Sequence, residues 1–189
     1  MKKILFSIVI TLLAFNICAQ NITYGAKAGL NITSINRTSE RAEIELKYAF
    51  HIGVTSKVEI SELFSIQAEL LYSSQGYSIS EVDGFEYDYT SSLNYINLPL
   101  MAIYNVGSVF SLEAGPQIGY LIGAPDTSRS NLSFYRPIDF SFNFGLGFKL
   151  NSRTSLGLRL NRGLNDISKN KDYSTKNIVA QLSFNYNFN

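Results

Sequence analysis

The chain has 189 residues and a formal net charge of +1, with 16 Lys and Arg against 15 Asp and Glu. This length fits one domain or one small barrel, and the balanced charge gives no reason to expect nucleic acid or an acidic partner. The sequence shows no metal-ligand cluster, no glycine-rich phosphate loop and no nucleic-acid motif. It therefore predicts neither a cofactor nor a bound metal.

The first residues are typical of a secretory signal peptide. Two lysines follow the initiating Met, an apolar run covers Ile4–Ile17, and the small residue Ala19 marks the expected cleavage position. We therefore expect a signal peptide over residues 1–19 and one mature domain over residues 20–189. The alternatives are an anchor helix, for which the run is short, and lipidation of Cys18, which is preceded by a poor match to a lipoprotein box. Cleavage after Ala19 removes Cys18, the one cysteine of the sequence, and leaves the mature chain without a disulfide or a thiol nucleophile.

After residue 21 the dominant pattern is alternation of apolar and polar side chains, which predicts β-strands. In Ile22–Thr33, for example, Tyr24 and Leu30 share one face, whereas Lys27 and Asn31 share the other. Eight such stretches occur, and their connections are alternately long and short. The expected strands are Ile22–Thr33, Lys47–Ile60, Phe64–Ile79, Phe85–Tyr104, Val109–Gly123, Ile138–Leu150, Leu156–Asn161 and Ile178–Phe188.

The predicted hairpin between the third and fourth strands has a distinctive tip. Asp83-Gly84 is a dipeptide favoured in type I′ turns. The segment Glu81–Asp88 carries four carboxylates, but their spacing does not match a calcium loop, so a solvated tip is expected. The candidate partner-binding residues on this exposed edge are Phe85, Tyr87 and Tyr89.

The alternation is unclear in the second half of this returning strand. In Leu93–Tyr104 the apolar face is opposed by Met101 and Ile103, which are also apolar. Pro99 lacks the N–H that a strand ladder needs, so the sequence predicts a β-bulge near it.

Ile138–Leu150 distinguishes two all-β architectures. All its apolar residues, four Phe among them, share one face, whereas Asp139, Lys149 and small residues share the other. A soluble sandwich would bury the apolar face, whereas a membrane barrel turns it to lipid. The alternating connection lengths favour the barrel, as does the terminal Phe188-Asn189, close to the aromatic that barrel-assembly machinery recognises. We therefore predict an all-β, eight-stranded antiparallel up-and-down transmembrane β-barrel in the bacterial outer membrane, with periplasmic termini.

The polar face of this predicted barrel carries charges of both signs. An eight-stranded barrel is only wide enough to be filled by side chains, and charges buried there need partners. A salt-bridged interior is therefore expected in place of an open pore. His51 is expected to be a hydrogen-bonded interior residue, since no serine motif beside it suggests catalysis. The residues expected in this interior network are Lys27, His51, Lys57, Glu59, Glu69, Glu113, Asp139, Lys149 and Arg159.

Short motifs recur in a characteristic order along the mature chain. They are Gly25–Asn31, Phe64–Ser73, Tyr95–Leu100, Glu113–Pro116, and Arg159 with Gly163–Ile167. In this order they resemble the PorT-like outer-membrane β-barrel proteins of Bacteroidetes. The resemblance implies an eight-stranded barrel of OmpX or OmpA size and a link to type IX secretion, but it transfers no functional residue. Ile103 departs from the family pattern, in which a lysine often stands in that strand, and this changes the interior charge balance.

Several functional hypotheses follow. The first is a non-enzymatic outer-membrane barrel with an envelope structural or accessory role, acting through extracellular loops on another envelope or secretion-complex protein. The alternatives are a narrow porin-like channel and a lipid-modifying barrel enzyme, and a soluble small-molecule carrier if the barrel prediction is wrong. The expected partners are the barrel-assembly machinery during insertion, and outer-membrane lipid and lipopolysaccharide near Lys169, Lys171 and Lys176.

Overall fold

The structure is a computed structural model that describes residues 22–37, 42–82, 85–125, 132–169 and 174–188. The expected signal peptide and the Asp83-Gly84 turn lie outside these residues. In the described ranges, no helix combines the length and the apolar character needed to cross a membrane. The elements are β1 (Ile22–Arg37), β2 (Ala42–Glu45), β3 (Lys47–Glu59), β4 (Phe64–Val82), β5 (Phe85–Val106), β6 (Phe110–Gly123), the 3-10 helix η1 (Leu132–Phe134), β7 (Ile138–Lys149), β8 (Thr154–Gly163) and β9 (Thr175–Asn187).

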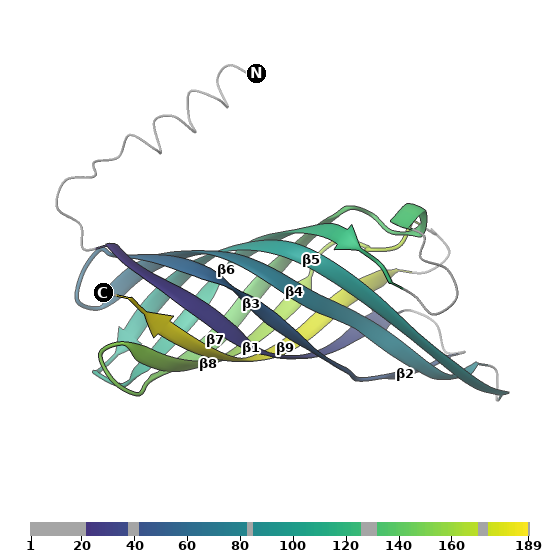
Figure 1. Ribbon diagram of the computed structural model, residues 1–189, viewed down its shortest axis with the longest axis horizontal. Coiled ribbons are helices and arrows are strands. Elements are labelled where there is room, and N and C mark those ends of the chain that lie inside the picture. Colours follow the sequence, from purple (N-terminus) through teal and green to yellow (C-terminus); the bar gives the residue numbers. More distant parts are fainter. Residues whose placement is uncertain (1–21, 38–41, 83–84, 126–131, 170–173, 189) are drawn as a thin grey trace, which may run out of the picture.

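Eight of these strands close into one antiparallel ring (Figure 1). Each strand from β3 to β8 pairs with the strand that follows it in the chain. β1 pairs with β3 on one side and with β9 on the other, which closes the ring. The short β2 pairs only with β4, outside the ring. The predicted eight-stranded antiparallel up-and-down barrel is therefore confirmed.

The two ends of the barrel differ in their connections. At the turn end, where β1 begins and β9 ends, the connections are tight (Figure 1). Asn151 organises one of these turns, because its Oδ1 accepts hydrogen bonds from the backbone N–H groups of Arg153 and Thr154, each at 2.9 Å. At the opposite end, called the loop end, residues 124–137 with η1 join β6 to β7, and residues 164–174 join β8 to β9.

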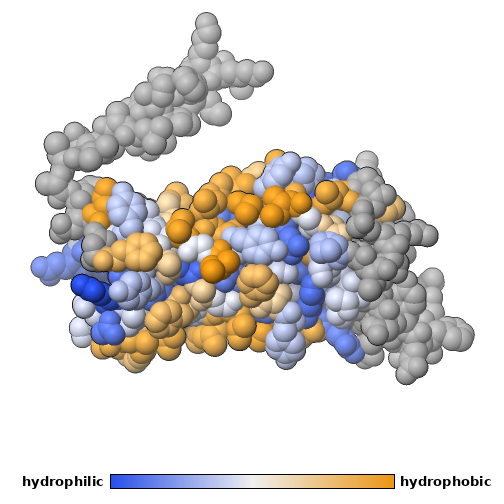
Figure 2. All heavy atoms as spheres, viewed as in Figure 1, coloured by the Kyte–Doolittle hydropathy of each residue, from blue (hydrophilic) through white to orange (hydrophobic). Residues whose placement is uncertain are grey.

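The outer surface of the ring is apolar along the middle of the strands. Leu30 and Phe144 are 61% and 60% exposed, which is unusual for large apolar residues of a water-soluble domain. Figure 2 shows hydrophobic residues over much of the visible middle of the barrel and hydrophilic ones toward its turn end. Exposed aromatic residues flank this belt, with Tyr24, Tyr104, Tyr186 and Phe188 toward the turn end and Tyr48, Tyr120 and Phe140 toward the loop end. An apolar belt between aromatic girdles is the outer surface of a transmembrane barrel.

A long hairpin extends from the loop end. β4 and β5 have 19 and 22 residues, and their paired ends project beyond the other strands (Figure 1). Gly76 adopts a φ of +132° where β4 leaves the ring, a conformation that favours glycine. Residues 85–93 of β5 pair with β4 only, since β6 first pairs at position 94. The side chains of Phe85, Tyr87 and Tyr89 lie outside the described set, so their predicted partner-binding role stays a prediction.

Pro99 lies within β5 and does not shift its register. Ala68 pairs with Leu100 and Leu71 pairs with Asn97, so the offset between β4 and β5 is the same on both sides of Pro99. The bulge predicted near Pro99 is therefore wrong. The fixed φ of proline is compatible with extended backbone, and the missing N–H removes one ladder bond without displacing the chain. The irregularity in β5 against β6 lies instead between positions 94 and 95.

Candidate functional site

Four charged side chains cross the middle of the barrel interior. Glu69 of β4 accepts a hydrogen bond from Lys27 Nζ of β1 at 3.1 Å. The two terminal nitrogens of Arg159 of β8 bind both Glu69 oxygens, at 2.8 and 2.9 Å, and one of them also donates to Glu113 of β6 at 2.9 Å. The side chains of Lys27, Glu69 and Arg159 are at most 3% exposed. Two cations and two carboxylates thus form a balanced ion cluster that ties strands on different sides of the barrel together.

A hydrogen-bonded chain through His51 lies next to this ion cluster. Asn31 Nδ2 donates to Ser73 Oγ, so Asn31 Oδ1 is the acceptor that faces His51 Nδ1 at 2.8 Å. His51 Nδ1 therefore donates, and Nε2 accepts from the Ser183 hydroxyl at 2.9 Å. Gln181 Nε2 also donates to Asn31 Oδ1, at 3.0 Å. The neutral histidine is held on both sides by residues from β1 and β9.

The order Ser183, His51, Asn31 is that of a nucleophile, a base and an orienting residue. Catalysis, however, requires a substrate to reach the hydroxyl, and these three side chains are at most 2% exposed. Even a Cβ added to the neighbouring Gly29 would lie 2.7 Å from His51 Cε1. The arrangement therefore supports packing between β1, β3 and β9, and it offers no space for a reacting lipid.

Asp139 of β7 lies apart from the ion cluster. Its Oδ2 accepts a hydrogen bond from Asn177 Nδ2 at 2.9 Å, and the same amide reaches the Tyr95 hydroxyl at 3.5 Å. The carboxyl group is buried, and within the described part of the chain it has no ion pair. Asp139 thus belongs to an amide and phenol network between the ion cluster and the loop end.

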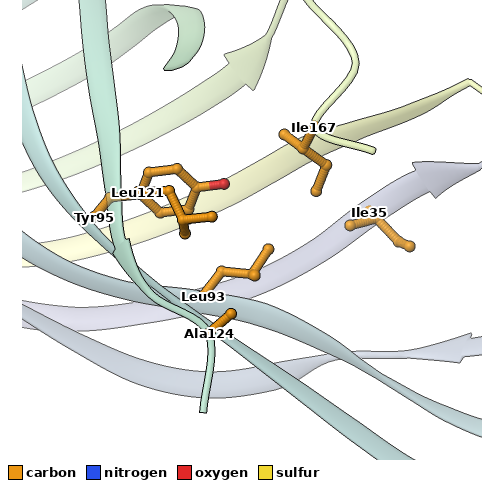
Figure 3. Close-up of a cluster of buried hydrophobic side chains, with 6 residues drawn as sticks. All are labelled: Ile35, Leu93, Tyr95, Leu121, Ala124 and Ile167. Carbon is orange, nitrogen blue, oxygen red and sulfur yellow. The ribbon is translucent and has the colours of Figure 1, made fainter. Parts of the chain in front are cut away.

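Apolar side chains fill the interior at the loop end (Figure 3). Leu93 and Tyr95 of β5 point toward Leu121 of β6, and Ile167 enters from the connection after β8. Leu93, Tyr95 and Ile167 are completely buried. We call this set the apolar plug; its members are Ile35, Leu93, Tyr95, Leu121, Ala124 and Ile167. The plug excludes water from the loop end of the interior.

The turn end of the interior is open and polar. A cavity of about 260 Å³ begins there and reaches Glu113, the edge of the ion cluster. Lys57 and Glu59 form an ion pair of 3.2 Å at its rim, with side chains 24% and 49% exposed. Lys149 also lines this cavity and is exposed. Because the ion cluster and the apolar plug lie beyond it, the cavity is a vestibule that ends inside the barrel.

The structure separates the nine predicted interior residues into groups. It brings Lys27, Glu69, Glu113 and Arg159 together, and it places Lys57 with Glu59 at the rim. His51 and Asp139 lie in hydrogen-bond networks with amide, hydroxyl and phenol partners, and Lys149 lies at the vestibule mouth. Sequence reasoning missed Ser183 and most of the apolar plug. The inward alternation of Ser183 with Gln181 was a usable signal, whereas nothing local marks Ile167 as inward.

The described residues hold no group of three or more His, Cys, Asp or Glu side chains arranged to bind a metal ion. The chemistry that remains is electrostatic and structural: opposite charges neutralise one another, and amides and hydroxyls satisfy the buried polar groups around them.

Comparison with known proteins places this geometry among outer-membrane barrels. A family model described as an outer membrane protein beta-barrel domain matches residues 18–169. The Neisserial surface protein A, NspA, has a similar structure, with a TM-score of 0.60, 9% sequence identity, and coverage of 86% of this chain and 96% of that one. The attachment invasion locus protein Ail of Yersinia pestis gives a TM-score of 0.53 at 12% identity, with coverage of 88% of this chain and 99% of that one. No curated protein matches the chain in sequence.

Proposed function

Because this chain belongs to the outer membrane protein β-barrel family, we propose that it is a non-enzymatic barrel with an envelope structural or accessory role. Its fold and family place it in the bacterial outer membrane. The role itself rests on how the interior is filled. The ion cluster and the apolar plug occupy successive levels of the barrel, so the loop end and the outer surface are what the protein offers to partners.

We propose that the turn end faces the periplasm and the loop end faces the exterior. The short turns and both termini of the described barrel lie at one end, which is the periplasmic arrangement in bacterial outer-membrane barrels. The projecting hairpin of β4 and β5 then stands outside the membrane.

The open edge of this hairpin supports a partner-binding role. Residues 85–93 of β5 keep one edge unpaired among the described strands, and such an edge accepts an added strand from another protein. Phe85, Tyr87 and Tyr89 occupy alternate positions along the same stretch and would add aromatic contacts to the strand pairing. The proposed partner is an envelope or secretion-complex protein. The resemblance to PorT-like proteins of Bacteroidetes makes a type IX secretion component the specific candidate.

A shortened hairpin tests this role. Replacing residues 79–89 by Asn-Gly joins Ser78 to Thr90, which already pair, through a two-residue turn, so the ring is retained. We expect the shortened protein to reach the outer membrane and migrate as a folded barrel, but to leave the defects of a deletion strain uncorrected. Envelope permeability and the amount of secreted type IX cargo are the readouts.

A triple serine variant and the deletion strain separate strand pairing, aromatic recognition and the type IX link. Serine at positions 85, 87 and 89 keeps the strand edge but removes the aromatic side chains, which distinguishes edge pairing from side-chain recognition. Full correction of the deletion defects by the shortened protein would contradict a role for the hairpin. Normal cargo secretion in the deletion strain would remove the type IX link and leave the structural role.

A further inference from the structure

A basic hollow lies on the outer wall of the barrel at the loop end. Arg162 of β8 alternates with outward-facing Leu158, Leu160 and Leu164, so it points away from the interior. On β9, Lys176 also faces outward and pairs directly with Asn36 of β1. These residues line a hollow of about 300 Å³ together with Ser174 and the apolar Leu164 and Ile178.

The hollow lies at the border of the apolar belt. Below it, toward the turn end, β8 and β9 present leucine, alanine and phenylalanine to the outside. Other strands carry Tyr48, Tyr120 and Phe140 near this border, as an aromatic girdle does. On β8, β9 and β1 the corresponding positions hold Arg162, Lys176 and Asn36 instead. The positive charge is thus local to one sector of the wall.

The cations of the hollow are available to a ligand. Within the described ranges, neither Arg162 nor Lys176 makes an ion pair. Asp166 interacts electrostatically with Lys176, and its Oδ1 accepts hydrogen bonds from Ser174 Oγ at 2.6 Å and from Thr175 N at 3.0 Å. The Ser174 bond is the main cause that lowers the pKa of Asp166. Asp166 is therefore occupied in shaping the loop beside the hollow.

We propose that this hollow binds a phosphate group of lipid A in the outer leaflet. The guanidinium of Arg162 suits the bidentate geometry of phosphate oxygens, Lys176 adds a second positive charge, and the Asn36 and Ser174 side chains supply further polar contacts. Ile178 lies on the turn-end side of Lys176, where an acyl chain would leave the headgroup for the apolar belt, and Leu164 adds apolar surface on the loop-end side of Arg162. This assignment rests on the proposed orientation, in which the loop end meets the lipopolysaccharide leaflet.

The test uses the refolded full-length mature protein in phospholipid nanodiscs and measures binding of purified bis-phosphorylated lipid A. The variant R162Q/K176Q removes both cations, and K149Q/R153Q removes two exposed cations at the turn end as a matched control. We expect the wild type and the control to bind alike and R162Q/K176Q to bind ~30-fold more weakly, as expected for two cations at a membrane surface. Dephosphorylated lipid A should bind all proteins weakly.

Several outcomes would overturn the site. Equal binding by R162Q/K176Q and the wild type would do so, and so would equal binding of dephosphorylated lipid A. Competition by millimolar inorganic phosphate would assign the hollow to a free anion instead of a lipid. Orientation is measured separately, by labelling of S152C and L132C in intact cells with a membrane-impermeant reagent. Labelling of S152C alone would contradict the proposed orientation while leaving the nanodisc result intact, so the two failures are distinguishable.

Discussion

Glu69→Gln is expected to lower the free energy of unfolding by about 3–5 kcal/mol, because it leaves two buried cations with one carboxylate. Glu69 binds Lys27 at 3.1 Å and both terminal nitrogens of Arg159 at 2.8 and 2.9 Å, and its side chain is fully buried. Glutamine keeps the shape and one acceptor but removes the charge. Urea unfolding of the protein in lipid vesicles, followed by the loss of heat-modifiable gel migration, measures this change.

The matched control is Glu59→Gln in the rim pair with Lys57. These side chains are 49% and 24% exposed, so the same substitution should cost less than about 1 kcal/mol. High salt should reduce the small effect at Glu59 and leave the effect at Glu69. Similar losses for the two variants would show that the ion cluster is not a buried structural unit.

Gly53→Ala is expected to cost about 1–3 kcal/mol or more and to reduce the yield of folded barrel, because the strands leave no room for a side chain there. Gly53 of β3 lies in register between Lys27 of β1 and Leu71 of β4. An added Cβ would overlap the backbone carbonyl oxygen of Leu70 and lie 2.8 Å from both Cα and Cδ2 of Leu71. The contact with the backbone cannot be relieved by a change of rotamer.

Gly157→Ala is the control for this effect. Gly157 also faces the interior, but the nearest atoms to an added Cβ are Asn185 Nδ2 and Ser183 Cβ, each at 3.7 Å. Alanine there should be tolerated or slightly stabilising, since glycine weakens strand interiors. The ratio of folded to unfolded bands after refolding compares the two variants. If Gly53→Ala refolds as well as Gly157→Ala, the close strand contact at Gly53 is not a constraint on folding.

The fold was predictable because strand alternation is a local property. In Ile138–Leu150 every second side chain is apolar, and one period of two residues is enough to assign both faces. The extension of β1 from Thr33 to Arg37 was not predicted, since Ser34–Arg37 lacks a clear apolar face. Pairing with the start of β9 extends this strand, and such pairing is not visible in either segment alone.

The interior contacts were less predictable because they join distant parts of the chain. The mixture of charges on the inward face predicted that they pair. Which carboxylate pairs with Arg159 could not be predicted, because the contact with Glu69 depends on strand tilt and on the reach of the side chains across the barrel. The contact between His51 and Ser183 joins residues 132 positions apart. The apolar plug was missed for another reason. Leu93 and Leu121 face inward near the strand ends, where the simple rule of a polar interior no longer applies.

The closed interior is tested most directly by single-channel recording of the wild-type protein in a planar lipid bilayer, after gel migration has verified that it is folded. The ion cluster and the apolar plug should block the interior, so we expect a silent bilayer at every applied voltage. Steady conductance steps from the folded wild type would contradict a closed interior and make a narrow channel the better description.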